Sequence, residues 1–504
     1  MAGPGSRRQV IRPTASECKP ESSRGNAVLT GADDPGTMRE RKLPAEQRCD
    51  DDRPRRMVRE DNTNQAGGIA CGARAHCTPD HGRRAGLRSA RDGAVGRLIP
   101  TTTGLEETPM AEIRDVVVLS GVRTAIGDYG GSLKDVPTVD LAASVVREAV
   151  ARSGLEPMDI GHVAIGNVVH GDVRDMYISR YAALNGGLPI ETPAFTVNRL
   201  CGSGLQSIVL ASQAIMVGDC ESAVAGGAEN MSRSAYWVPG ARWGQRMGDG
   251  KLIDPMTGAL SDPFDACHMG VTAENVAEKW GISREDQDAL AVESHKRAAA
   301  AIADGRFKEQ ILPVELKTRK GVTIFDTDEH VRADASVEGM AKLRTAFKKD
   351  GTVTAGNASG INDAAAAVVL MERRAAEARG LKPAMRLVAY AHSGVEPKYM
   401  GIGPTPAIRK VLDRAGLGIG DMDLIELNEA FAAQALGVAR DLDLPMDKTN
   451  PNGSGISLGH PIGATGTILT VKTLYELQRS GGRYGLVSMC IGGGQGIAAI
   501  FERL

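Results

Sequence analysis

Apolar positions along the chain follow two periods, which begin to alternate near residue 110. Val116-Val117-Val118-Leu119 is a short continuous apolar run, typical of a buried strand, whereas residues 141–151 place apolar side chains at helical spacing. Apolar runs and amphipathic segments then follow one another, with glycine at many junctions. This pattern predicts an α/β protein.

The pattern occurs twice. Residues 152–165 and 414–425 share an Arg-x-Gly-Leu start, an aspartate and an apolar run, at an offset of 262 positions. A looser echo pairs residues 223–227 with the apolar run that ends at Cys490. We therefore predict two similar α/β halves, the second of which starts near Pro383.

Two stretches depart from this alternation. The segment 231–360 holds all three tryptophans and one strong predicted helix, which starts on the capping residue Ser283. We predict a cap that contacts ligand and other subunits. Residues 1–109 are rich in Arg, Gly, Pro, Ser and Asp and keep no period, which predicts a disordered extension or a start codon assigned too early. The predicted units are 1–109 (extension), 110–230 (first half), 231–360 (cap), 361–382 (return to the first half) and 383–504 (second half).

Charge and cysteine content exclude several classes of protein. The 504 residues carry a net charge of −2, of which +4 falls on residues 1–109 and −6 on the remainder. An acidic body argues against nucleic acid as the main partner. No apolar run approaches the roughly 20 residues that span a membrane. The cysteines beyond residue 109 are four and widely spaced, which indicates a reducing compartment, and we expect a cytoplasmic protein.

Metal binding is not predicted. One group of potential zinc ligands occurs in the extension, but its spacing fits no standard zinc finger and no second ligand pair follows. Its members are Cys71, His76, Cys77 and His81.

Two cysteines stand beside glycine-rich turns. Cys201 comes just before a helical pattern, and Gly202 and Gly204 leave it accessible from one side. The N-terminal end of a helix dipole favours a thiolate and can lower the thiol pKa, which suits an activated nucleophile. Cys490 ends an apolar strand and precedes four glycines in five positions, so its thiol would face bare backbone N–H groups. Either residue could instead be a small buried cysteine.

A histidine and an asparagine complete the candidate chemistry. His460 lies between Gly459 and Pro461, in a predicted loop from a strand to a helix, and the proline restricts its backbone so that the imidazole is aimed. Histidine is the usual group that takes a thiol proton near neutral pH. Asn428 follows the strand at 424–425 and carries an amide that could hold a water molecule.

From Met110 to Leu504 the chain resembles a thiolase over essentially its whole length. Four signatures carry the resemblance, in this order: Asn198-Arg199-Leu200-Cys201-Gly202-Ser203-Gly204, Asn428-Glu429-Ala430-Phe431, Gly459-His460-Pro461 and Cys490-Ile491-Gly492-Gly493-Gly494-Gln495-Gly496. They are most similar to those of bacterial biosynthetic β-ketothiolases, that is, acetyl-CoA acetyltransferases. The resemblance implies the thiolase fold, with two βαβαβαββ halves in a layered αβαβα arrangement and a cap inserted in the first half. It also implies a homotetramer.

The resemblance further implies a reversible Claisen condensation of two acyl-CoA molecules by a ping-pong route. Cys201 would attack an acyl-CoA carbonyl and hold the acyl group as a thioester, while His460 takes its proton. Cys490 would remove a proton from the second acetyl-CoA and protonate the CoA thiolate in reverse. His460 and a water on Asn428 would form one oxyanion hole, and the backbone N–H groups of Cys201 and Gly492 would form the other.

Six further residues would bind acyl-CoA by the same resemblance, although each could equally be a packing residue or a solvated charge. They are His268 and Met269 at the acyl pocket and CoA tail, Arg332 near the nucleotide end, Ser359 at the pantetheine, and Phe347 and Met400 along the tunnel. Neither a GxGxxG nor a Walker-type loop occurs. Coenzyme A and acyl-CoA are therefore expected as substrates, with no permanently bound cofactor.

Three alternatives stay open: a degradative 3-ketoacyl-CoA thiolase of fatty-acid oxidation, a ketoacyl synthase of the same fold, and a non-catalytic acyl-CoA-binding protein. A ketoacyl synthase needs no second catalytic cysteine, so Cys490 favours the thiolase. A binding protein would tolerate loss of Cys201, His460 or Cys490, yet all three are present. We expect a role such as polyhydroxyalkanoate precursor synthesis, with acyl chain length set by the space near Met269 and Met400.

Overall fold

The computed structural model describes residues 113–319 and 321–504, so the predicted extension 1–109 and the candidate zinc ligands lie outside the described residues. The elements of the first half are β1 (Val116–Thr124), β2 (Gly127–Asp128), α1 (Thr138–Ser153), β3 (His162–Gly166), α2 (Ile178–Asn185), β4 (Ala194–Val197), α3 (Ser203–Met216), β5 (Ser222–Asn230), β11 (Asn362–Glu372) and α8 (Arg373–Ala378). Those of the second half are β12 (Met385–Gly394), α9 (Pro404–Ala415), β13 (Leu424–Leu427), α10 (Ala432–Leu442), α11 (Gly455–Leu458), α12 (Thr465–Ser480), β14 (Tyr484–Ile491) and β15 (Gln495–Arg503).

The main sheet repeats one strand order. It runs β13-β14-β15-β12-β1-β11-β5-β3-β4, so β12, β13, β14 and β15 take the places that β1, β3, β5 and β11 take in the first half. The starts of β3 and β13 (162 and 424), of α3 and α12 (203 and 465) and of β5 and β14 (222 and 484) are each 262 residues apart. The repeat predicted from the sequence is therefore present in the structure.

One strand of the second half departs from the predicted βαβαβαββ order. Where the first half has β4, the second half has a single parallel bridge between Ile425 and Thr449. The next residue, Asn450, adopts a left-handed conformation with φ of 50°, which an extended strand cannot accommodate. The third strand of this half is therefore reduced to a point of contact.

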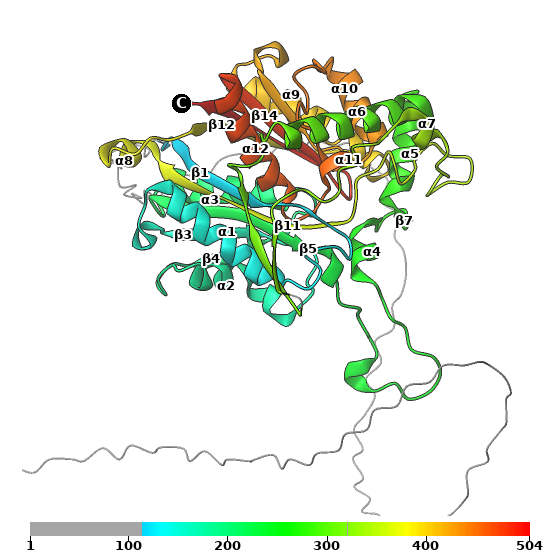
Figure 1. Ribbon diagram of the computed structural model, residues 1–504, viewed down its shortest axis with the longest axis horizontal. Coiled ribbons are helices and arrows are strands. Elements are labelled where there is room, and N and C mark those ends of the chain that lie inside the picture. Colours follow the sequence, from blue (N-terminus) through cyan, green and yellow to red (C-terminus); the bar gives the residue numbers. More distant parts are fainter. Residues whose placement is uncertain (1–112, 320) are drawn as a thin grey trace, which may run out of the picture. The chain divides into compact units, whose positions relative to one another are not determined.

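The helices and strands form stacked layers, which Figure 1 shows from α1 and α2 at the bottom of the view to α9 and α10 at the top. Three apolar cores lie between these layers. Side chains on opposite faces of a strand enter different cores. Val117 of β1 packs with α1 and α2, and its neighbour Val118 packs with α3 and α12. In β14, Val487 joins the same α3–α12 core, and Leu486 packs with α9 and α10. The result is the predicted αβαβα layering.

The chain between β5 and β11 leaves the sheet and returns to it. It forms α4 (Pro255–Ala259), β6 (Ser261–Asp262), β7 (Cys267–His268), α5 (Met269–Lys279), α6 (Arg284–Ala303), β8 (Ile311–Leu312), β9 (Val314–Thr318), β10 (Gly321–Phe325) and α7 (Val337–Ala341). α6 matches the predicted helix, and the hydroxyl of Ser283 caps it by accepting from the N–H of Asp286 at 3.1 Å. The short helix η5 (Pro397–Ile402) and α10 pack against α5, while α11 packs against α6. Among the described helices, none is long and apolar enough to cross a membrane.

Candidate active site

One cavity of about 530 Å³ is bordered by both halves and by the segment between β5 and β11. Ten of the eleven residues that the sequence predicted for the site line it, namely Cys201, His268, Met269, Arg332, Phe347, Ser359, Met400, His460, Cys490 and Gly492. The eleventh, Asn428, is fully buried behind the wall of the cavity, against the ring of His460. The structure thus brings together residues that are up to 291 positions apart, from Cys201 to Gly492.

Cys201 is presented by a tight turn directly before α3. Leu200 adopts a left-handed conformation with φ of 46°, which is uncommon for a side chain of its size. The hydroxyl of Ser203 donates to the carbonyl of Leu200 at 2.6 Å, and the N–H of Gly202 donates to the carbonyl of Arg199 at 3.0 Å. These bonds stabilise the turn and place the thiol at the beginning of the helix, facing the cavity.

Burial governs the ionisation of Cys201. Burial raises the pKa of the thiol, N–H groups of Gly492 and of Cys201 itself lower it, the carboxyl of Glu229 adds a smaller upward effect, and the resulting pKa is about 11. The sequence led us to expect that the start of α3 would lower this pKa. That expectation is wrong because desolvation outweighs the backbone donors. At neutral pH the thiol is therefore protonated, and it needs a base to become a nucleophile.

His460 lies in a loop between α11 and α12, not after a strand as the sequence predicted, because residues 455–458 form one helical turn. Burial lowers the pKa of its imidazole to about 4, so the ring is neutral near pH 7. The hydroxyl oxygen of Thr465 lies 2.7 Å from Nδ1 and donates its hydrogen to the carbonyl of Pro461 at 2.9 Å. With its hydrogen on the Pro461 carbonyl, the hydroxyl accepts from Nδ1–H, and this arrangement leaves Nε2 unprotonated. The histidine is thus prepared to receive a proton at Nε2.

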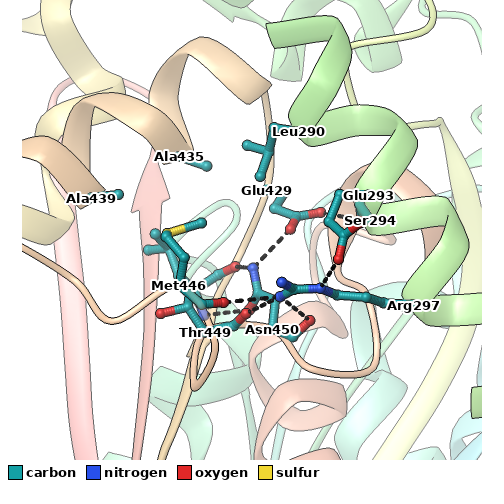
Figure 2. A pocket seen from close by; sticks show the side chains of 11 residues that line it. Leu290, Glu293, Ser294, Arg297, Glu429, Ala435, Ala439, Met446, Thr449 and Asn450 are labelled. Carbon is teal, nitrogen blue, oxygen red and sulfur yellow. Dashed lines mark hydrogen bonds and ion pairs between the residues drawn. The ribbon is translucent and has the colours of Figure 1, made fainter. Parts of the chain in front are cut away.

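Asn428 and Glu429 form the support behind the histidine. Nδ2 of Asn428 lies 3.4 Å from Nε2 and 3.5 Å from Nδ1 of His460. The carboxylate of Glu429 accepts from the hydroxyl of Ser294 at 2.6 Å and from the amide of Asn450 at 2.9 Å, as Figure 2 shows beside α6. These buried bonds fix the start of the segment 428–431 and with it the amide that faces the imidazole.

Cys490 is the second-to-last residue of β14, and its register partner on β15 is Gly496. Burial and the neighbouring Cys201 both raise the pKa of its thiol well above the ordinary range. Two thiols this close in a desolvated site oppose each other's ionisation. A Cβ at Gly492 would lie 3.0 Å from the end of Met269 and 3.3 Å from Leu200, so the missing side chain keeps this part of the cavity open.

The part of the cavity wall that adjoins Cys490 is apolar and aromatic. The rings of His268 and Phe347 are stacked at 4.6 Å, and Phe347 meets Phe431 edge to face at 6.2 Å. Burial lowers the pKa of His268, whose Nδ1 accepts from the first turn of α5. Met269 and Met400 pack with Phe431 and Cys490 in one apolar cluster. This wall suits the apolar part of a long, thin ligand.

Charge is found at another part of the lining. The side chain of Arg332 is 65% exposed, and its guanidinium lies 3.8 Å from the carboxylate of Asp128, which also pairs with His330. His330 lines the same cavity, and the N–H of Ser359 donates to the carbonyl of Ala430 at 2.9 Å. An exposed arginine beside this histidine suits an anionic group.

Sequence reasoning missed several lining residues. Phe431 and Ile462 lie within or beside the signatures around Asn428 and His460, so their position carried a signal. Met231, Leu260 and His330 carry no motif and enter the site through the fold. Among residues 113–319 and 321–504, no group of His, Cys, Asp and Glu side chains is arranged to hold a metal ion.

Comparison with known proteins defines the class. The description "Thiolase, N-terminal domain" matches residues 116–374, and "Thiolase, C-terminal domain" matches residues 381–503. The chain therefore belongs to the thiolase family, and the predicted fold is confirmed.

Particular relatives are similar over the same part of the chain. Beta-ketothiolase BktB of Cupriavidus necator is 64% identical over 392 residues, which cover 78% of this chain and 100% of the relative. An acetyl-CoA acetyltransferase of Chromobacterium violaceum is 50% identical and covers 77% of this chain and 100% of its own length.

Solved structures of thiolases are similar to this chain over the same residues. The acetyl-CoA acetyltransferase of Bacillus anthracis has a TM-score of 0.77 at 46% identity, over 78% of this chain and 100% of that chain. Human mitochondrial 3-ketoacyl-CoA thiolase in complex with CoA has a TM-score of 0.76 at 45% identity, over 78% of this chain and 99% of that chain. The predicted enzyme class, an acyltransferase, is that of the named relatives.

Proposed function

We propose that the protein is a β-ketothiolase, an acetyl-CoA C-acetyltransferase that condenses two acyl-CoA molecules to 3-ketoacyl-CoA and CoA, reversibly and by a ping-pong route. The observation that carries this proposal is the meeting of Cys201, His460 and Cys490 at one cavity. A thiolase-family protein with two thiols and a neutral imidazole in one cavity has the groups for covalent catalysis and for proton transfer.

In the first half-reaction Cys201 becomes acylated. Nε2 of His460 takes the thiol proton, and the sulfur attacks the carbonyl carbon of acetyl-CoA. The oxyanion is held by the backbone N–H groups of Cys201 and Gly492, the donors that already face the sulfur. When the C–S bond to CoA breaks, the leaving thiolate takes a proton from Cys490. The site then holds an acetyl thioester on Cys201, a protonated His460 and a Cys490 thiolate.

In the second half-reaction the new carbon–carbon bond forms. The Cys490 thiolate removes a proton from the methyl group of a second acetyl-CoA. The enolate oxygen is stabilised by Nε2–H of His460 and by a water held on Asn428. The enolate carbon attacks the acetyl group on Cys201, and the expelled thiolate takes back its proton from His460. All three groups return to their resting protonation states.

Substrate binding follows the two parts of the lining. The apolar wall that contains Met269, Phe347 and Met400 would hold the pantetheine and acyl portions, with Ser359 at the pantetheine and His268 at the CoA tail. Arg332 would contact the nucleotide end. Supporting this assignment, a similar thiolase has been solved in complex with CoA. No permanently bound cofactor is included in the proposal.

Assembly as a homotetramer is also proposed. A segment between β5 and α4 carries exposed large apolar side chains, which monomeric surfaces rarely gather. Trp237 is 60% exposed, Trp243 84% and Met247 92%. We expect light scattering on the purified protein to give four times the chain mass, and a Trp243→Ser/Met247→Ser variant to give a smaller assembly. An unchanged mass for that variant would remove this segment from the interface.

The protein is proposed to act in the cytoplasm and to supply 3-ketoacyl-CoA. Cys201, Cys220, Cys267 and Cys490 are all free thiols in the structure, which suits a reducing compartment such as the cytoplasm. A supply of 3-ketoacyl-CoA for polyhydroxyalkanoate precursors or for fatty-acid metabolism is the proposed role.

Thiolysis by the purified full-length protein tests the enzyme. Acetoacetyl-CoA, 3-ketovaleryl-CoA and 3-ketohexanoyl-CoA are each mixed with CoA, and loss of the 3-ketoacyl thioester is followed by absorbance. We expect turnover of at least the first, and the ratio of kcat/KM values reports the chain length that the cavity accepts. Mass spectrometry after mixing with acetyl-CoA should find one acetyl group on the peptide containing Cys201. Absence of both signals would reject the proposal.

A further inference from the structure

We infer that Asn362 is a positioning residue that sets the backbone at His460 and thereby aims the imidazole at Cys201. The inference rests on the function proposed above and adds to it a residue that lies in the other half of the fold. Asn362 is the first residue of β11 and is fully buried. Its carboxamide reaches across to the loop between α11 and α12.

The contact with the histidine is direct. Oδ1 of Asn362 accepts from the backbone N–H of His460 at 2.9 Å. Pro461 follows and has no N–H, so the dipeptide offers a single backbone donor, and Asn362 takes it. A buried backbone donor left without a partner costs free energy, so this bond holds the peptide in one orientation.

The opposite end of the carboxamide is also held. Nδ2 donates to the carbonyl of Gly127 at 3.1 Å and lies 3.4 Å from Oδ1 of Asp128. Both neighbours of Nδ2 are acceptors, and the neighbour of Oδ1 is a donor. A reversed amide would place like groups against each other at both ends, so the assignment of the oxygen toward His460 is unambiguous.

Two glycines make room for this side chain. Gly459 has φ of 111°, and a Cβ there would lie 2.5 Å from Cγ of Asn362. A Cβ at Gly360 would lie 2.6 Å from Oδ1 of Asn362. The residue before the histidine must therefore be glycine both for its backbone conformation and for the approach of the carboxamide.

The geometry explains why a buried asparagine is placed here. His460 has its ring fixed at Nδ1 by Thr465, but a ring turns with its backbone. The loop belongs to the second half, whereas Cys201 belongs to the first. A link from β11 to the N–H of His460 ties the base to the half that carries the nucleophile. Loss of such a link changes the distance between the groups that exchange a proton.

Two variants test the polar link. Asn362→Ala removes both the acceptor for His460 and the donor to Gly127. Asn362→Asp keeps the acceptor for His460, and its second oxygen, which faces the Gly127 carbonyl and Asp128, stays protonated because burial and the neighbouring carboxylate oppose its ionisation. We expect kcat for acetoacetyl-CoA thiolysis to fall about 100-fold in the alanine variant, the effect of a displacement near 1 Å. KM should change by less than about twofold, because substrate contacts are kept. The aspartate variant should recover at least about tenfold of the lost kcat.

Asn230→Ala is the matched control. Asn230 is equally buried at the end of β5, and its Nδ2 donates to the carbonyls of Leu133 at 2.9 Å and Val136 at 2.8 Å. It makes no hydrogen bond to the site, so its kcat should stay within about twofold of the wild type. Thermal unfolding of all three variants reports which of them are folded at the assay temperature.

The outcomes are distinct. If the wild-type protein shows no thiolysis, the proposed function is rejected, and the inference that rests on it is rejected as well. An active wild type with equal kcat values for the alanine and aspartate variants overturns the inference alone, since the acceptor at His460 would then be irrelevant. If the alanine variant does not fold, the aspartate variant decides. A kcat near the wild type with an intact Cys201 acetylation rate supports the role, and a loss of about 100-fold overturns it.

Discussion

The hydroxyl oxygen of Thr465 lies 2.7 Å from Nδ1 of His460 and donates its own hydrogen to the carbonyl of Pro461. A hydroxyl has one hydrogen to give, so with that hydrogen on Pro461 the bond to Nδ1 runs from the imidazole to Thr465. The pair therefore selects one tautomer of a buried, neutral histidine. The nitrogen left free is the one that the proposed chemistry needs as a base.

Removal of this hydroxyl is expected to slow acylation of Cys201. Thr465→Val leaves the shape of the side chain and abolishes the acceptor for Nδ1–H. An unsatisfied buried donor costs about 1–3 kcal/mol, which corresponds to roughly 5- to 160-fold in rate if it appears in the transition state. Single-turnover acetylation with acetyl-CoA measures the step.

Thr470→Val is the control for this substitution. Thr470 is buried in the same helix, α12, and its hydroxyl donates to the carbonyl of Gly466 at 2.9 Å, away from the imidazole. Its acetylation rate should match that of the wild type. Equal rates for Thr465→Val and Thr470→Val would contradict tautomer control by Thr465.

The pH dependence of Cys201 reactivity follows from its raised pKa. Burial places this pKa at about 11, so the thiolate is the minor form and its fraction grows about tenfold per pH unit up to that value. His460, with a pKa of about 4, stays neutral between about pH 6 and about pH 10 and adds no inflection. We expect the rate of iodoacetamide modification to rise across this range without a plateau.

Peptide mass spectrometry distinguishes modification at Cys201 from modification at the other thiols. A Cys201→Ser protein identifies the background at each pH. A rate that levels off near neutral pH would show a stable thiolate–imidazolium pair in the free protein and would contradict the assignment of neutral resting groups.

Much of the fold and of the site was accessible from the sequence because the signals are local. The capping serine at 283 marks the start of α6, and the glycines around Cys201, His460 and Cys490 mark turns that expose side chains. The offset of 262 positions in the sequence by itself indicates two halves. Each of these inferences needs only neighbouring residues or self-similarity.

The features that the sequence could not predict depend on contacts between distant segments and on how deeply a side chain is buried. The pKa of Cys201 was expected to fall at a helix start, but the balance is decided by desolvation, which requires the packed structure. His460 was expected to follow a strand, but residues 455–458 before it form one turn of helix. The bond from Asn362 to His460 joins residues 98 positions apart in different halves, and no motif spans that interval.

Cys490 is expected to be required for condensation, whereas acylation of Cys201 should survive its loss. In Cys490→Ser the nucleophile and its base are untouched, and CoA, an ordinary thiol, can leave as a thiolate that water then protonates. Mass spectrometry should therefore still find an acetyl group on Cys201. A serine hydroxyl is a much weaker acid than a thiol and cannot supply the base for the second acetyl-CoA. Loss of general-base catalysis lowers the condensation rate by about 100-fold or more. Full condensation activity in this variant would refute the role assigned to Cys490.

The buried ion pair between Lys472 and Glu426 makes a prediction about stability. Nζ of Lys472 lies 2.7 Å from Oε2 of Glu426 and 2.6 Å from the carbonyl of Gly453, with side chains 1% and 0% exposed. Removal of one partner of a buried ion pair leaves the other charge buried without a counter-ion. Lys472→Met should therefore lower the free energy of unfolding by about 3–5 kcal/mol. The double variant Lys472→Met/Glu426→Leu, which removes both charges, should recover most of that loss.

The effect of Lys472→Met should also depend on pH. Burial raises the pKa of Glu426 to about 7 while Lys472 lowers it, so loss of the lysine moves this pKa further upward. A carboxyl whose pKa is higher in the folded than in the unfolded protein destabilises the fold as pH rises and it must ionise. Urea unfolding should accordingly show a larger deficit near pH 8 than near pH 6 for the single variant, and no such difference for the double variant. A deficit that is equal at both pH values would show that Glu426 is neutral in the folded variant throughout this range or escapes to solvent.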